Sequence, residues 1–331
     1  MTSSLKKILV TGATGSLGLE VCRSLSKKGY QLVATGRNAK LSDEFKSLNV
    51  IFKRGDLTDA VFVDSLFADV DHVIHCAALT SPLGRWKKFY LANVVSTKNI
   101  VEAAKKYNVK RVIHLSTPSI YYNGKPRLHV KESEVIPAAF TNYAKSKLMA
   151  EELVEELEQH GVETIILRPR AIFGPNDQVL LPRILRLMHK GFFPLFNSGK
   201  AVVDMTYIDN VIDAIELSLN APAEALYKKY NITNGEPRVI LSIFKEIEQG
   251  LGLKVKYIHV PLKPLMALAN VVESIFLLFN INKEPALSQY SIGLMSFDHT
   301  LSIEEAKKYL NYHPKTSISE GLKKTLVSWK K

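Results

Sequence analysis

The first half of the chain alternates short apolar runs with longer stretches in which apolar residues recur every three or four positions. The short runs are rich in β-branched residues and predict strands. They read KILVT (7–11), QLVAT (31–35), VIFKR (50–54), HVIHCA (72–77), RVIHLS (111–116) and TIILRP (164–169). The longer stretches predict helices, most clearly over 16–28, 93–107 and 143–160. Strands regularly separated by helices predict an α/β fold with a doubly wound parallel sheet of the Rossmann type.

After Pro169 the pattern loosens, because prolines divide the chain into shorter elements. They are Pro175, Pro182, Pro194, Pro222, Pro237, Pro261 and Pro264. We therefore expect a sheet core over 1–170, to which 207–235 returns. A smaller C-terminal lobe would consist of 171–206 and 236–331. Ligands of such sheets bind at the carboxyl ends of the strands, where the strand order reverses.

Composition narrows the class of protein. Among 331 residues, 46% are hydrophobic and 23% are charged, as in an ordinary globular protein. The two cysteines, Cys22 and Cys76, are far apart, which argues against a disulfide framework or a zinc site and indicates a reducing, cytoplasmic compartment. The first apolar run breaks at Gly12 and is too short for a signal-peptide core, so we expect no export.

The net charge of +12 raises the question of an anionic partner. The basic residues are scattered as pairs such as Lys27/Lys28 and Lys323/Lys324, without interleaved aromatic residues. This pattern favours solvated helix faces, and we expect no nucleic-acid partner. A positive field could still attract a phosphorylated cofactor or an anionic membrane surface.

A glycine-rich loop follows the first strand directly and precedes a helix: KILVT continues into GATGSLG, residues 12–18. Glycines at a strand-to-helix turn allow a pyrophosphate to approach the backbone, and the helix N-terminus binds its charge. The loop predicts a dinucleotide site formed by Gly12, Thr14, Gly15, Ser16, Leu17 and Gly18. The core is then the cofactor-binding part, and the lobe binds substrate.

The end of the second strand, VATGRNAK, bears on which dinucleotide binds. An NAD site usually has an acidic residue there for the ribose 2'-hydroxyl, and this chain has none. Arg37 offers a guanidinium suited to a phosphate, with Asn38 and Lys40 as helpers. We expect NADP, with NAD as the alternative.

Two further loops follow strands. In GDLTD (55–59), Asp56 and Leu57 are candidates for the adenine end of the cofactor, although Asp56 or Thr58 could instead cap the next helix. In HCAAL (75–79), small residues such as Ala77 suit a cofactor lying flat against the sheet edge. The histidines on these strands have no carboxylate or cysteine partners in the pattern, so we expect no metal site.

The sequence TNYAKSK (141–147) places a tyrosine four residues before a lysine, on one face of a predicted helix. The fifth strand delivers Ser116 and Thr117 to the same edge of the sheet. A hydroxyl, a phenol and an ammonium would thus converge there. A nearby ammonium would lower the phenol's pKa toward the range of a general acid/base.

Together these residues resemble the extended short-chain dehydrogenase/reductase family, over essentially the whole chain. The matching segments are TGATGSLG, GDL, CAA, Asn93 in ANVVSTKNIV, LSTPSIY, YAKSK and RPRAIFGP. The resemblance implies Thr117, Tyr143 and Lys147 as catalytic residues, with Lys147 also holding the nicotinamide ribose and Ser116 as a structural hydroxyl. It places Asn93 behind the site and Pro169 against the nicotinamide, and implies a homodimer through helices of the core.

The branch of the family depends on other features. Sugar-nucleotide epimerases and dehydratases usually carry an asparagine where Ala171 stands. DMTYIDNVIDAI (204–215) and the C-terminal region look like the branch of 3β-hydroxysteroid dehydrogenases and bacterial β-keto acid reductases. We expect a ketone/alcohol oxidoreductase acting on a lipophilic substrate; the alternatives are a nucleotide-sugar epimerase or dehydratase and a non-catalytic cofactor-sensing regulator.

The segment PLKPLMALANVVESIFLLFNI (261–281) is strongly apolar, but Lys263 and Glu273 leave no uncharged run long enough to span a membrane. It is interpreted either as a helix buried in the substrate lobe or as one that lines a lipophilic pocket or contacts a bilayer surface.

Overall fold

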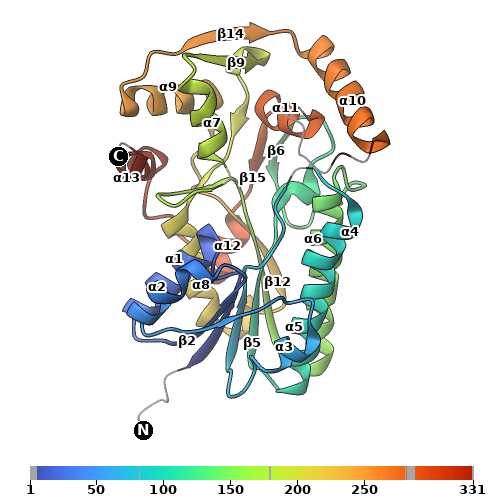
Figure 1. The fold of residues 1–331 in the computed structure, drawn as a ribbon, viewed down its shortest axis with the longest axis vertical. Helices are drawn as coiled ribbons and strands as arrows, with labels where there is room; N and C mark the ends of the chain where they lie inside the picture. Colours follow the sequence, from blue (N-terminus) through green and yellow to red (C-terminus); the bar gives the residue numbers. More distant parts are fainter. Residues whose placement is uncertain (1–5, 82, 179, 280, 282–287, 330–331) are drawn as a thin grey trace.

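The computed structural model describes residues 6–81, 83–178, 180–279, 281 and 288–329. In this part of the chain, parallel strands form a seven-stranded sheet in the order β12-β7-β5-β4-β1-β2-β3 (Figure 1). They are β1 (Lys7–Thr11), β2 (Gln31–Gly36), β3 (Ile51–Arg54), β4 (His72–His75), β5 (Arg111–Leu115), β7 (Glu163–Pro169) and β12 (Lys228–Ile232). Six of them coincide with the predicted strands, so the predicted doubly wound parallel sheet is confirmed.

Helices cover both faces of the sheet (Figure 1). On one face α1 (Ser16–Lys27), α2 (Ser42–Ser47) and α8 (Ile208–Leu219) pack in a common apolar core. On the other face are α3 (Ala60–Asp64), α5 (Ser96–Lys106) and α6 (Asn142–Glu155). Each helix buries one face, as the three-to-four-residue apolar spacing predicts.

The predicted helix boundaries differ from the structure at two places. The helix expected over 93–107 begins earlier, as α4 (Trp86–Phe89), and passes through a π-helical segment, Tyr90–Val95, before α5. The helix expected over 143–160 ends as α6 and continues as a 3-10 turn, Glu156–His160. Propensity defines helix ends poorly.

The lobe lies above the carboxyl ends of the strands in Figure 1. Its four-stranded sheet contains β6 (Arg127–Val130), β10 (Val202–Val203), β13 (Arg238–Val239) and β15 (His299–Leu301). Two strand pairs join β8 (Ile172–Phe173) to β11 (Thr206–Tyr207) and β9 (Phe192–Phe196) to β14 (Lys256–Val260). The other helices are α7 (Leu181–Met188), α9 (Ile240–Leu251), α10 (Leu262–Leu278), α11 (Gln289–Ser296), α12 (Glu304–Leu310) and α13 (Ile318–Trp329).

Segments from distant parts of the sequence complete the core. The strand β12 adds to the sheet edge beside β7, so part of 207–235 returns to the core sheet. Helix α12 packs against β12 and α8, and its Ala306 and Leu310 are buried in the core cluster. Residues near the C-terminus, in the range assigned to the lobe from sequence, therefore also stabilise the core.

The apolar segment 261–281 forms α10 and the residues after it. Leu265 and Ala269 pack toward Phe196 and Ile292 in the lobe. The opposite face exposes the apolar side chains of Leu268, Val271, Ile275 and Leu278. Asn280 and the Leu277 side chain lie outside what the structure describes. The buried-helix interpretation therefore holds for one face of α10 only, and no described helix is both long and apolar enough to cross a membrane.

Candidate functional site

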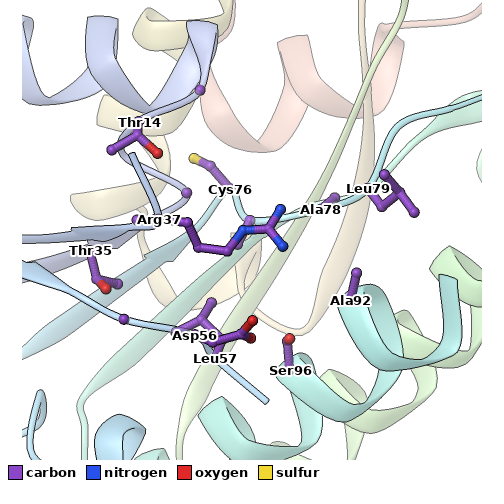
Figure 2. A pocket seen from close by; sticks show the side chains of 15 residues that line it. Thr14, Thr35, Arg37, Asp56, Leu57, Cys76, Ala78, Leu79, Ala92 and Ser96 are labelled. Atoms are coloured by element: carbon purple, nitrogen blue, oxygen red, sulfur yellow. The ribbon is translucent and has the colours of Figure 1, made fainter. Parts of the chain in front are cut away.

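The strand order of the main sheet reverses between β1 and β4, and a cavity of about 300 Å³ lies at the carboxyl ends of β1 to β4 (Figure 2). This is where the crevice of a doubly wound sheet binds its ligand. Half of the predicted cofactor residues line this cleft: Gly12, Thr14, Gly15, Arg37, Asp56, Leu57 and Ala77. The lining also includes residues that sequence reasoning missed, namely Thr35, Gly36, Gly55, Cys76, Ala78, Leu79, Ala92 and Ser96. Ser16, Leu17 and Gly18 instead form the first turn of α1.

The glycine loop approaches its neighbours so closely that side chains do not fit. Gly12 has φ +65°, and a Cβ there would lie 2.7 Å from the Ala77 backbone. A Cβ on Gly18 would lie 2.3 Å from the Gly12 carbonyl oxygen. Gly15 is the N-cap residue of α1, so the N–H groups of the first helical turn lie next to the loop. The loop therefore fits a pyrophosphate at a helix N-terminus.

Arg37 extends over the cleft in Figure 2. A second arginine, Arg54, borders an adjoining hollow together with Arg37. Arg54, at the end of β3, donates from Nε to the Arg37 carbonyl oxygen at 3.1 Å. Both side chains border a hollow next to Gly55 and Asp56. Arg54 was missed in the sequence because only the pairing of Gly36 with Arg54 across parallel strands brings the two arginines together.

Asp56 is held by its own turn. Its carboxylate accepts hydrogen bonds from the backbone N and the hydroxyl of Thr58, both at 2.9 Å, and the backbone hydrogen bond is the main reason why its pKa is lowered. Helix α3 is capped by Asp59, which accepts from Val61 N and Phe62 N. The alternative in which Asp56 or Thr58 caps this helix is therefore wrong.

Thr117 and Tyr143 lie at the same edge, on the other side of the switch point. The Thr117 hydroxyl donates to Ser119 Oγ at 2.9 Å and accepts from Ser119 N at 3.2 Å, which caps the 3-10 turn Pro118–Tyr121. Tyr143 is in the first turn of α6, half-buried. Burial raises the pKa of Tyr143, and the neighbouring Thr117 hydroxyl partly opposes this shift. Among the protein groups alone, the cost of burying a phenolate dominates, and the lower pKa expected from the ammonium together with an oxidised nicotinamide stays a prediction.

The Lys147 ammonium is buried and contacts the fifth strand. It donates to the Leu115 carbonyl oxygen at 2.7 Å and to His114 Nε2 at 3.0 Å. Burial lowers the pKa of Lys147 to about 8, and the charge of Glu151 opposes the shift. Burial also lowers the pKa of His114, so its ring is neutral and its Nε2 can accept. His114 is a partner that the sequence did not reveal.

Three further residues that the sequence singled out are Asn93, Pro169 and Ser116. Asn93 is buried; its Oδ1 accepts from Leu79 N at 2.7 Å, and its Nδ2 donates to Leu79 O and to Ser146 Oγ. It thus links the wall of the cleft to α6. Pro169 ends β7 beside Ile232 of β12, and Ser116 is buried without a hydrogen-bond partner for its hydroxyl among the described residues.

Comparisons with known proteins agree with this geometry. The model of the NAD dependent epimerase/dehydratase family matches residues 8–233. The chain is 36% identical over 98% of its length to the Escherichia coli protein named Uncharacterized protein YbjS, covering 97% of it. It is 31% identical over 97% of its length to a 2-alkyl-3-oxoalkanoate reductase of Stenotrophomonas maltophilia, covering 99% of that protein. A mouse relative, sterol-4-alpha-carboxylate 3-dehydrogenase, decarboxylating, is 26% identical over 99% of this chain and 92% of its own length.

Among solved structures, the UDP-glucose 4-epimerase of Thermotoga maritima aligns over 98% of both chains with a TM-score of 0.79 at 22% identity. At that identity the likeness supports the fold alone. The family model, by contrast, spans the glycine loop, the arginine pair and the Tyr143–Lys147 helix. This chain therefore belongs to the NAD dependent epimerase/dehydratase family and is an NAD(P)-dependent enzyme of the extended short-chain dehydrogenase/reductase type.

Proposed function

We propose that this enzyme interconverts a ketone and a secondary alcohol on a lipophilic substrate, a β-keto acid or a sterol-like molecule, with NADP as cofactor. The observation that carries the proposal is that Thr117 and Tyr143 lie at the same edge of the sheet as the cleft formed by the glycine loop and Arg37. Residues 1–170 with 207–235 would hold the cofactor, and 171–206 with 236–331 the substrate.

Each catalytic group has a separate task. When bound, the nicotinamide supplies or accepts the hydride. Thr117 holds the substrate oxygen by a hydrogen bond, and Tyr143 transfers the proton to or from that oxygen. Because burial raises the pKa of Tyr143, the phenol keeps its proton at neutral pH. This is the form that donates a proton to a ketone oxygen during reduction.

The cofactor assignment rests on the two arginines. Both side chains border one hollow beside Asp56, and neither forms an ion pair with a carboxylate among the described residues. A 2'-phosphate is dianionic near neutral pH and forms strong hydrogen bonds with planar guanidinium groups. Gly12, Thr14, Gly15 and the α1 N-terminus would bind the pyrophosphate, with Asp56 and Leu57 at the adenine end. Lys147 would hold the nicotinamide ribose, and Pro169 would lie against the nicotinamide.

The substrate class rests on the relatives and on residue 171. The names of two relatives describe substrates that carry a carboxylate on the carbon next to the one that is reduced or oxidised. Ala171 is exposed with φ +42°, a conformation that asparagine tolerates better than alanine. The side chain at this position therefore lacks the amide with which the sugar-nucleotide enzymes would bind a nucleotide.

A second candidate is a nucleotide-sugar epimerase or dehydratase, favoured by the fold shared with the UDP-glucose 4-epimerase. A cofactor-sensing regulator fits less well, because Thr117, Tyr143 and Lys147 are all present. The assay that separates them follows NADPH consumption with a 2-alkyl-3-oxo acid and compares UDP-glucose as substrate and as stabilising ligand. NADPH oxidation that depends on the oxo acid supports the proposal. A rise in melting temperature with UDP-glucose and none with the acid favours the epimerase.

The NADP assignment has its own test. Hydrogen bonds to charged groups contribute about 1.5–3 kcal/mol, so Arg37→Ala or Arg54→Ala should weaken NADPH binding about 10- to 100-fold. The affinity for NADH should change little, because NADH lacks the 2'-phosphate. Isothermal titration of both cofactors measures this difference, with the exposed Lys46→Ala in α2 as the control. Equal losses for NADPH and NADH would contradict a 2'-phosphate site.

A further inference from the structure

Beyond the proposed catalytic residues, a group of buried polar side chains lies where β7 ends and the lobe begins. Arg170 directly follows Pro169, and only 6% of its surface is exposed. Asp204, Tyr122 and His299 are almost fully buried nearby, and Tyr290 of α11 borders them. Buried polar groups are normally hydrogen-bonded, so those without partners call for an explanation.

Several atoms of this group have no partner among the described residues. They are Arg170 Nε, Tyr122 Oη, Asp204 Oδ1 and both ring nitrogens of His299. No ion pair joins Arg170 to a described carboxylate: Asp204 interacts with it electrostatically but lies beyond ion-pair distance. Leaving a buried guanidinium without a hydrogen-bonded anion costs several kcal/mol. The Arg170 guanidinium is nevertheless buried where β7 meets the lobe.

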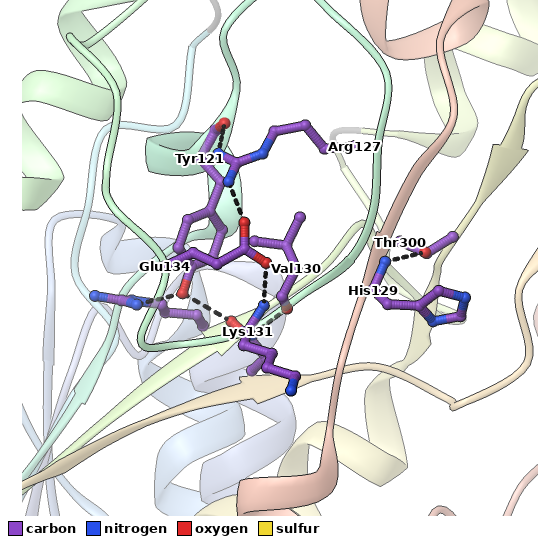
Figure 3. Close-up of polar contacts among 9 residues, drawn as sticks. Tyr121, Arg127, His129, Val130, Lys131, Glu134 and Thr300 are labelled. Atoms are coloured by element: carbon purple, nitrogen blue, oxygen red, sulfur yellow. Dashed lines mark hydrogen bonds and ion pairs between the residues drawn. The ribbon is translucent and has the colours of Figure 1, made fainter.

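The surroundings hold this group in place. Leu301 N donates to Asp204 Oδ2 at 2.7 Å, which fixes the carboxylate at the β15 strand. The β6–β15 junction is tied by His129 N donating to Thr300 Oγ1 at 2.8 Å (Figure 3). At the start of β6, Arg127 bonds to the Tyr121 carbonyl oxygen and pairs with Glu134 (Figure 3). The unpartnered atoms therefore belong to anchored elements.

A line of hydroxyls leads from the proposed catalytic residues to Arg170. Thr117 donates to Ser119, and Ser119 Oγ lies 2.6 Å from Tyr290 Oη. Tyr290 interacts electrostatically with Tyr143 on one side and with Arg170 on the other. Its ring packs edge-on against Tyr122, with centroids 5.0 Å apart. Tyr290 thus contacts both Ser119, which bonds to Thr117, and Tyr122 of the buried group that contains Arg170.

We propose that Arg170 recognises the carboxylate of a 3-oxo acid, or of the matching 3-hydroxy acid, while Thr117 and Tyr143 hold the oxygen that changes oxidation state. A guanidinium binds a carboxylate with parallel N–H donors, and neutral Tyr122 and His299 offer further hydrogen bonds. The inference rests on the proposed function and identifies a specificity residue for it. It explains why a cation without an ion-pair partner is buried at this place.

The test compares a 2-alkyl-3-hydroxy acid with its methyl ester, both in the presence of NADP. The ester keeps the hydroxyl and the alkyl chain but lacks the charge. Wild-type protein should bind the acid about 10- to 100-fold more tightly than the ester. Arg170→Gln should remove this preference and leave the affinity for the ester within about twofold. Arg170→Lys should restore part of the preference for the acid. The control is Arg186→Gln, at an exposed position of α7.

Calorimetry and turnover separate this inference from the proposed function. If the acid and ester are oxidised but Arg170→Gln weakens both equally, Arg170 has a packing role and the inference falls, while the oxidoreductase stands. If neither is oxidised but Arg170→Gln still removes selective binding of the acid, the carboxylate site stands and the proposed reaction falls. No preference for the acid in the wild type would overturn the inference, and circular dichroism of each variant checks that it is folded.

Discussion

At the scale of single residues, Tyr143 is the group whose chemistry is most open to test. Replacing it with phenylalanine removes the transferable proton and little else, so kcat/KM should fall about 10²- to 10⁴-fold while NADP affinity stays nearly unchanged. Steady-state rates and calorimetry measure the two effects. Tyr107→Phe, which removes an exposed phenol bonded to Asp64, is the matched control. Full activity of Tyr143→Phe would reduce the Tyr143/Lys147 pair to a structural contact.

Lys147 gives a pH-dependent prediction. Its pKa is lowered to about 8 by burial, so the side chain is an ammonium below that pH and increasingly neutral above it. The anionic cofactor prefers the ammonium, so binding takes up a proton above pH 8. The affinity for NADP should therefore fall as pH rises beyond 8, by at most about tenfold per pH unit for one linked proton.

Measuring the NADP dissociation constant across this pH range tests the idea. In Lys147→Ala, binding should be weaker and its decline above pH 8 should disappear. His114 faces Lys147 but stays neutral there, because burial lowers its pKa further from this range. A decline that persists in Lys147→Ala would assign the linked proton to another group.

At the scale of elements, a buried ion pair fastens the helix that carries Tyr143 to the sheet. Arg168 of β7 pairs with Glu151 of α6, and both side chains are fully buried. Arg168 also donates to the Tyr121 hydroxyl, which in turn donates to Asn231 of β12. Glu151 is one turn after Lys147, so this pair also defines where α6 lies relative to β5.

Glu151→Gln should lower the free energy of unfolding by about 3–5 kcal/mol, because it leaves the Arg168 charge buried without its partner. Glu155→Gln is the matched control: it makes the same change on the same helix, where Glu155 pairs with Lys229 near the surface. That loss should be about 1 kcal/mol or less. Urea unfolding measures both. Similar losses for the two variants would show that the buried pair contributes no more than an exposed one.

The outer face of α10 is the second element with a testable role. Its exposed side chains Leu268, Val271 and Ile275 are apolar, and we expect this face to contact a bilayer surface peripherally. Changing all three to serine should abolish sedimentation with anionic vesicles and cost roughly 0.5 kcal/mol each in stability. Leu265→Ser, on the buried face, should instead cost about 2–5 kcal/mol. Unchanged vesicle binding by the triple variant would contradict the membrane contact.

At the scale of the whole molecule, the lobe and the sheet core are not independent along the chain. Tyr312 Oη donates to the Thr233 carbonyl oxygen, and Ile303, Ala306 and Leu310 join the main core. The C-terminal part of the chain therefore stabilises the cofactor half as well as the lobe. A homodimer through helices of the core stays a prediction, which light scattering of the purified protein would test.

The sequence by itself determined the features that depend on neighbouring residues. Alternating strands and amphipathic helices are periodic over short windows, so the sheet and most of its helices could be predicted. The glycine loop and the Tyr143–Lys147 spacing are also local, since each lies within one turn or one strand-to-helix connection. These signals identified seven residues of the cleft, among them Gly12, Arg37 and Ala77, before the strand order was known.

Only the tertiary structure decided which distant residues meet. Arg54 lies beside Arg37 because β3 pairs with β2, and His114 accepts from Lys147 because α6 packs on β5. Ser119 and Tyr290 are 171 positions apart, yet their hydroxyls lie 2.6 Å from each other. Burial also raises the pKa of Tyr143, an effect that no local sequence pattern contains. Contacts and burial depend on how strands, helices and the lobe pack together. No pattern within a short window of sequence contains that information.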